Sequence, residues 1–64
     1  RDSTKEFLHF LSITLGSLAE LETQLILAQR LAYLGEHDLQ ILLSKTSEIG
    51  RMVRGLQKSL KAKL

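Results

Sequence analysis

Cysteine, proline and tryptophan are absent from this chain of 64 residues, and aromatic residues make up only 5% of it. Without cysteine the chain has neither disulfides nor thiolate metal ligands, which are two common means of stabilising so small a domain. Without proline, nothing in the sequence forces a helix to end early. The remaining means of stabilisation is association, with a second copy or with a partner. The lack of cysteine also fits a cytoplasmic protein, which we expect.

The chain also lacks a strong net charge and a long apolar run. Its net charge of +2 is too small to indicate nucleic-acid binding by itself. No uninterrupted apolar run approaches the roughly 20 residues of a membrane span, so we expect no membrane association. The charge is unevenly distributed, because residues 1–35 sum to −1 and residues 36–64 sum to +3. From Ile49 onward there are five basic residues and no acidic ones.

Apolar residues recur at alternating spacings of three and four along most of the chain, which is the pattern of amphipathic helices. The first expected helix spans about residues 4–34 and begins at the capping-box sequence Ser3-Thr4-Lys5-Glu6. Gly35 is suited to the left-handed conformation that ends a helix, and it leads directly into a second expected helix, about residues 36–63. Because so short a connection makes antiparallel neighbours, the sequence predicts an all-α fold, an antiparallel αα-hairpin.

One apolar stripe on each expected helix should form the contact between them. About ten further apolar residues lie beside these stripes, so each stripe is wider than one helix–helix contact can cover. Because burial of each such side chain contributes about 1.5–3 kcal/mol, we expect further association. The hairpin would then be half of an up-down four-helix bundle, completed by oligomerisation or by a missing segment. The expected core and interface residues are Phe7, Leu11, Leu18, Leu21 and Leu25 in the first helix, and Leu39, Leu42, Ile49, Val53, Leu56 and Leu60 in the second, and each stripe has one threonine as a soft spot, Thr14 and Thr46.

A stripe of basic residues is the main candidate for a binding site. Arg51, Arg54, Lys58 and Lys61 follow one another at spacings of three, four and three, which places them on one face of a helix, with Lys63 nearby. Such a stripe can neutralise the phosphates of a nucleic acid. The alternative is an ordinary solvated face whose cations complement the dipole at the helix C-terminus. No aromatic residues alternate with the stripe to stack on bases.

No cluster of residues indicates catalysis or cofactor binding. Glu6 and His9 have the E-x-x-H spacing of metal-binding bundles, but His9 falls opposite the expected contact and Glu6 is explained as part of a cap. Glu20 and Glu22 are turned apart by their spacing of two, whereas acid–base carboxylates must converge. We therefore expect no catalytic, cofactor or metal site, no small-molecule substrate and no enzymatic activity.

Several stretches of the chain resemble one bacterial family. These are the four-helix-bundle proteins linked to intervening sequences in large-subunit ribosomal RNA, and accessory variability proteins of diversity-generating retroelements are similar. The resemblance covers essentially the whole chain but only the C-terminal half of the family pattern, so we expect a fragment of a longer four-helix protein. The matching stretches are Lys5-Glu6-Phe7, Gly16-Ser17-Leu18-Ala19-Glu20-Leu21-Glu22-Thr23-Gln24-Leu25, Ala32-Tyr33-Leu34, Ile49-Gly50-Arg51-Met52, Gly55-Leu56 and Lys58-Ser59-Leu60.

The resemblance implies an up-down four-helix bundle that assembles into pentameric rings, with a basic surface that binds nucleic acid or a reverse transcriptase. A dimer of hairpins that rebuilds four helices is an equally suitable assembly. Two hypotheses for function follow. In the first, the chain is an oligomeric helical scaffold that binds RNA or a nucleic-acid enzyme through its basic face. In the second, it is a purely structural module for protein–protein interaction.

Overall fold

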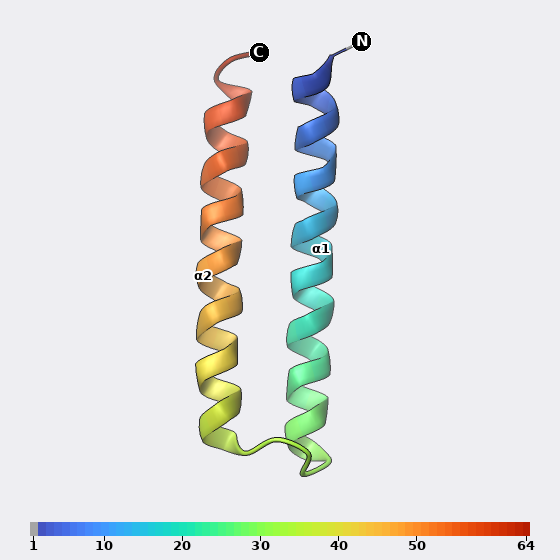
Figure 1. Cartoon of the computed structure of the whole chain (residues 1–64), viewed down its shortest axis with the longest axis vertical. Helices are drawn as coiled ribbons and strands as arrows, with labels where there is room; N and C mark the ends of the chain where they lie inside the picture. Colours follow the sequence, from blue (N-terminus) through green and yellow to red (C-terminus); the bar gives the residue numbers. More distant parts are fainter. Residues whose placement is uncertain (1) are drawn as a thin grey trace.

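The chain forms two long helices, as described by a computed structural model that covers residues 2–64. Helix α1 spans Ser3–Arg30 and helix α2 spans Glu36–Lys61, with residues 31–35 between them. The helices run antiparallel and side by side, so both termini lie at one end and the connection lies at the other (Figure 1). The described residues contain no strand. The predicted all-α hairpin is confirmed. It is a single layer whose Cα atoms span 47 × 17 × 9 Å.

Helix α1 begins one residue earlier than the predicted capping box. Asp2 is the N-cap, and its Oδ1 accepts hydrogen bonds from the backbone amides of Thr4 (3.0 Å) and Lys5 (3.3 Å). Ser3, predicted as the cap, is instead the first helical residue. A carboxylate satisfies these amides and its negative charge also complements the helix dipole, which favours Asp2 over the Ser3 hydroxyl.

Helix α1 ends earlier than predicted, at Arg30 rather than near Leu34, and the predicted role of Gly35 is wrong. Ala32, with φ of 64°, takes the left-handed conformation. The amide of Tyr33 donates to the Ala28 carbonyl (2.9 Å) and that of Ala32 to the Gln29 carbonyl (3.0 Å), which together form a Schellman motif. Gly35 is the extended N-cap of α2. Several residues are needed here because the chain must cross the roughly 8–10 Å between two helix axes.

The contact between the helices is a stripe of residues at alternating spacings of three and four, which we call the contact stripe. Its members are buried or half-buried, and they include polar as well as apolar residues. This pattern is that of antiparallel helices with coiled-coil-like packing. The contact stripe consists of Leu8, Leu11, Leu15, Leu18, Glu22 and Leu25 in α1, and Leu39, Leu43, Thr46, Gly50, Val53, Gln57 and Leu60 in α2.

The contact stripe is rotated relative to the expected one. Among the expected core residues, the structure places Leu11, Leu18, Leu25, Leu39, Val53 and Leu60 in the stripe, with Leu42 half-buried beside it. Of the two threonines expected as soft spots, Thr46 lies in the stripe and is buried, whereas Thr14 is exposed. Phe7, Leu21, Ile49 and Leu56 are instead exposed in the hairpin. Each of these four residues immediately precedes a member of the stripe, and the other expected members stay in it, so each helix is rotated about its axis by less than one residue step. The rotation is possible because the apolar surface of each helix is wider than the contact.

The core of the hairpin is very small. Among the described residues, Leu11 and Leu39 are the only buried hydrophobic side chains, with 9% and 5% of their surface exposed. The third buried side chain, that of Thr46, is polar. One layer of two helices therefore leaves most of its apolar surface in contact with solvent.

By length and composition, α1 is also long and apolar enough to cross a membrane. The most apolar 18-residue window of this helix has a mean hydropathy of 1.2, and 6% of it is buried in the hairpin. Core helices of soluble proteins and signal sequences share this length and composition, so this property assigns no location to the chain.

The left-handed residue gives a prediction about stability. Ala32→Gly removes the steric penalty of an L-residue at positive φ and should raise the free energy of unfolding by about 1 kcal/mol. The same change in the interior of α1, Ala19→Gly, should lower it by about 1 kcal/mol. Urea unfolding followed by circular dichroism, at one fixed protein concentration, measures both. Equal effects of the two substitutions would contradict the left-handed assignment.

Candidate functional site: two opposite faces of the hairpin

Exposed apolar residues from both helices gather on one side of the contact stripe, and we call this side the apolar face. In an antiparallel pair, positions at the same offset from the contact lie on the same side of it. Phe7 and Leu21 immediately precede stripe residues in α1, and Ile49 and Leu56 do so in α2. Phe10 of α1 and Met52 of α2 lie on the same side, slightly further around each helix from the contact. They are 61% and 67% exposed. The apolar face therefore consists of Phe7, Phe10, Leu21, Ile49, Met52 and Leu56.

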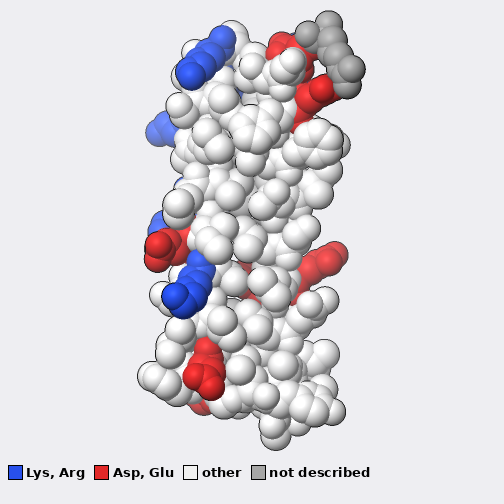
Figure 2. All heavy atoms as spheres, in the orientation of Figure 1, with Lys and Arg blue, Asp and Glu red and all other residues white. Residues whose placement is uncertain are grey.

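Figure 2 looks onto this side of the hairpin and shows an almost uncharged surface along both helices, with lysine, arginine and acidic side chains gathered toward its edges and ends. Contiguous apolar surface of this extent on a soluble protein marks an interaction site. Four of the expected interface residues lie on this face rather than in the contact within the hairpin.

The basic stripe lies on the opposite side of α2. Arg51, Arg54, Lys58 and Lys61 are all exposed and occupy the positions that follow the contact stripe. The four residues span roughly 15 Å along the helix axis. The guanidinium Nη1 of Arg51 donates to the Ser47 hydroxyl (3.0 Å) within the same helix. Lys63, the fifth residue of the expected site, is exposed just beyond the end of α2, where its amide donates to the Leu60 carbonyl (3.1 Å).

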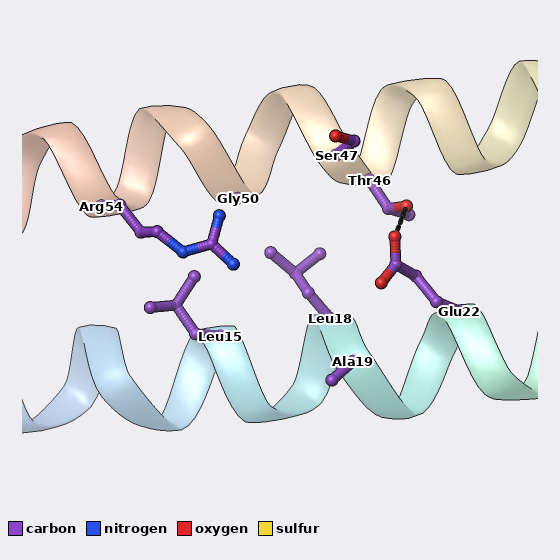
Figure 3. A pocket seen from close by; sticks show the side chains of 8 residues that line it. All are labelled: Leu15, Leu18, Ala19, Glu22, Thr46, Ser47, Gly50 and Arg54. Carbon is purple, nitrogen blue, oxygen red and sulfur yellow. Dashed lines mark hydrogen bonds between the residues drawn. The ribbon is translucent and has the colours of Figure 1, made fainter.

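A shallow groove of about 150 Å³ lies between the helices next to the basic stripe (Figure 3). Gly50 leaves room in it, and the Arg54 side chain lies over this glycine and extends toward Leu15 of α1. A Cβ atom on Gly50 would lie 3.2 Å from Nη1 of Arg54. Arg54 is therefore partly held in the groove.

A hydrogen bond across the helices lies at the end of this groove. The Thr46 hydroxyl lies 2.8 Å from Oε2 of Glu22 and 3.0 Å from the Leu43 carbonyl, and it donates to these acceptors (Figure 3). Gln57 of α2 makes a second cross-helix bond, in which its Nε2 donates to the Ser12 hydroxyl (3.1 Å). Both bonds place polar groups inside or beside the contact stripe, so they favour one register of the two helices over others.

The sequence analysis did not identify Glu22 and Thr46 as partners. Glu22 was considered there only as a possible acid–base carboxylate, whereas in the structure its carboxylate is half-buried and accepts the bond from Thr46. The available signal was the spacing: Glu22 continues the series Leu8, Leu11, Leu15, Leu18 at the same alternation of four and three. A charged residue in such a series is overlooked when the members of the stripe are chosen only for being apolar.

The polar residues considered for chemistry do not converge in the structure. Among residues 2–64, no three His, Asp or Glu side chains lie close enough together to hold a metal ion. His9 is exposed, and its ring packs at 6.0 Å from that of Phe10. Glu20 is exposed whereas Glu22 is half-buried, so the two carboxylates lie in different environments.

A two-helix layer with one uncovered apolar face has the form of an incomplete helical bundle. The model of the 23S rRNA-intervening sequence protein family matches residues 1–55, and the chain belongs to this family. The resemblance found in the sequence is thus confirmed. No curated protein and no solved structure gives a significant match to the chain.

The bond between Glu22 and Thr46 gives a second prediction about stability. Thr46→Val keeps the shape of the side chain but leaves the half-buried carboxylate without its hydroxyl partner, so it should lower the free energy of unfolding by about 1–3 kcal/mol. The double change Glu22→Leu with Thr46→Val replaces both partners by apolar groups and should recover most of this loss. Thermal unfolding at fixed protein concentration measures both variants.

The matched control is Thr23→Val, because Thr23 is exposed and its hydroxyl bonds only to the Ala19 carbonyl of its own helix (3.3 Å). Its effect should stay within about 0.5 kcal/mol. A loss in Thr46→Val no larger than that of this control would show that the cross-helix bond does not stabilise the hairpin.

Proposed function

We propose that this chain is a non-enzymatic subunit of an oligomeric helical bundle that binds nucleic acid, RNA in particular, through its basic stripe. The observation that carries the proposal is the separation of two surfaces on opposite sides of the hairpin. The apolar face is suited to assembly with other helices, and the basic stripe remains exposed when the apolar face is covered. Assembly then repeats the stripe and multiplies its phosphate contacts.

The geometry of the stripe supports contact with a phosphate backbone. Four cations over roughly 15 Å of one helix can lie along a backbone whose phosphates follow one another at intervals of a few ångströms. The chain has few aromatic residues, 5% in all, and none lies within the stripe. Stacking on bases would therefore contribute little, and the binding would depend on charge rather than on sequence. The name of the family refers to ribosomal RNA, which supports RNA as the first ligand to examine.

The proposal includes a cytoplasmic location and no catalysis. Acid–base catalysis requires side chains that converge on one substrate. Among the residues that line the groove, the Glu22 carboxylate accepts the hydrogen bond from Thr46, and the basic side chain is that of Arg54. These features support a binding role.

A second candidate function is a purely structural module for protein–protein association. The extent of the apolar face, with Phe10 and Met52 both more than 60% exposed, favours it. Under this alternative, the basic stripe is only a solvated face that complements the dipole of α2. The two functions differ in their response to salt, since apolar association survives high salt whereas phosphate binding does not.

The experiment is a binding titration of the chain with a fluorescently labelled single-stranded RNA, by fluorescence anisotropy at several salt concentrations. Four phosphate contacts predict a slope of log K against log salt of roughly −3. Lys58→Gln and Lys61→Gln should each weaken binding and bring the slope closer to zero by about 0.7. Arg30→Gln is the matched control, because it removes one charge at the other end of the hairpin and should change neither value appreciably. Absence of binding at low salt would reject the RNA-binding function.

A further inference from the structure

The groove between the helices has one edge on each helix. On α1, Ala19 lines the groove, and Ser12, seven residues earlier, accepts the hydrogen bond from Gln57 of α2. On α2, Ser47 and Arg54 line the groove and are also seven residues apart. Ser12, Ala19, Ser47 and Arg54 each follow directly after a member of the contact stripe. We call these two series of residues the groove edges.

Both groove edges continue toward the end of the hairpin at which the termini lie (Figure 1), and there each edge reaches a lysine. Lys5 lies seven residues before Ser12, and Lys61 lies seven residues after Arg54. In helices packed like a coiled coil, a step of seven residues returns to the same side of the helix. Lys5 and Lys61 are therefore on the same side of the hairpin as the groove, and both are exposed.

The two lysines also lie at nearly the same level along the hairpin. The hydrogen bond between Glu22 and Thr46 places these two residues opposite each other and so gives the register of the helices. Lys5 lies 17 residues before Glu22, and Lys61 lies 15 residues after Thr46. The difference of two residues corresponds to roughly 3 Å along the helix axis. Lys5 and Lys61 therefore face each other across the groove.

Two like charges at these positions are unusual. Positions that flank the contact between packed helices often carry opposite charges, which form salt bridges between the helices. Here the acidic residues nearest to Lys5 in the sequence are directed elsewhere. Oδ1 of Asp2 accepts hydrogen bonds from the backbone amides of Thr4 and Lys5, and Glu6 lies on the outer side of α1, away from α2. Lys5 and Lys61 therefore repel each other unless an anion lies between them.

We propose that Lys5 and Lys61 bind one phosphate group between them, so that the ligand spans both helices instead of lying along α2 alone. This inference rests on the proposed function, to which it adds a residue of α1 and a path for the phosphate backbone. Arg54 lies further along the same groove edge as Lys61, with its guanidinium over Gly50. The backbone therefore enters at the end where the termini lie and follows the groove toward Gly50.

The chemistry of the two side chains suits a phosphate group. The ammonium group of a lysine is a compact charge at the end of a flexible four-carbon chain, so two lysines on different helices can converge on one anion. A phosphodiester has two oxygens that are not esterified, which gives one acceptor to each ammonium group. Hydrogen bonds between ionised partners of this kind are stronger than those between neutral groups.

The first experiment repeats the titration with labelled single-stranded RNA on the full chain with Lys5→Gln. This variant should bind roughly fivefold more weakly at 0.1 M salt, and its slope of log K against log salt should be closer to zero by roughly 0.7. Lys45→Gln is the matched control, because Lys45 lies seven residues before Met52 and so on the side of the apolar face. It should change neither value. An unchanged slope in Lys5→Gln, with RNA still bound, would overturn the shared site and leave the proposed function intact.

A double variant tests whether the two lysines hold the same phosphate. Lys5→Gln combined with Lys61→Gln should bring the slope closer to zero by roughly 0.7, which is the effect of either change alone, because one shared contact is lost in all three variants. Two independent contacts would instead give a change of roughly 1.4. That result would overturn the shared site. Circular dichroism of each variant shows whether the helices persist.

The second experiment tests the site without RNA, by thermal unfolding at one fixed protein concentration in sodium phosphate and in sodium chloride of equal ionic strength. At a phosphate concentration near its dissociation constant, phosphate should raise the Tm of the parent chain by roughly 2 °C more than that of Lys5→Gln. The comparison with the variant removes the general stabilisation that phosphate salts produce. Equal shifts in the two proteins would overturn the site. A larger shift in the parent chain without any binding of RNA would support the site and reject the proposed function.

Discussion

Two helices in one layer can bury only one stripe each, and the rest of this structure depends on that constraint. The helices are long and apolar, yet only Leu11 and Leu39 among the described hydrophobic residues become buried. A longer pair of helices buries more apolar area in its contact, but the apolar area that stays exposed grows by the same factor. A longer hairpin would therefore leave the same fraction of its apolar surface exposed. Only a second layer of structure, from this chain or another, can cover that surface.

The contact stripe contains polar members that an ordinary apolar seam would not have. Glu22, Thr46 and Gly50 occupy central positions in it, where large apolar residues would contribute more burial. The bond between Glu22 and Thr46 fixes the register, and Gly50 leaves the space over which Arg54 lies. The contact stripe therefore has less apolar packing than a fully apolar stripe, and it contains polar groups and a groove instead.

The division into an apolar and a basic side connects assembly with the proposed binding of RNA. A single hairpin offers one stripe of four cations, which is a weak ligand for a phosphate backbone at physiological salt. The proposed assembly through the apolar face would repeat the stripe without using any of its residues. The increase in affinity would then come from the number of stripes on one particle rather than from a more specific site.

The sequence predicts that each helix has a packed side and an exposed side, but it does not fix how far each helix is rotated about its own axis. The spacing of three and four predicts a packed stripe at Leu11, Leu18, Leu25 and Val53, and these residues lie in the contact. The same spacing also accommodates either Phe7 or Leu8, and either Ile49 or Gly50, because adjacent apolar positions differ by only one step around the helix. The choice follows from the fit of both helices together, in which Glu22 of α1 meets Thr46 of α2.

The sequence by itself determined the two helices, their antiparallel order, the basic stripe from Arg51 to Lys61 and the family. These are local or periodic properties that each helix carries alone. The tertiary structure decided which side of each helix faces its neighbour, and so that Phe7, Leu21, Ile49 and Leu56 form one exposed surface. It also decided that Ala32, not Gly35, takes the left-handed conformation. Both results depend on how the two helices pack against each other at a fixed distance, which cannot be deduced from either helix alone.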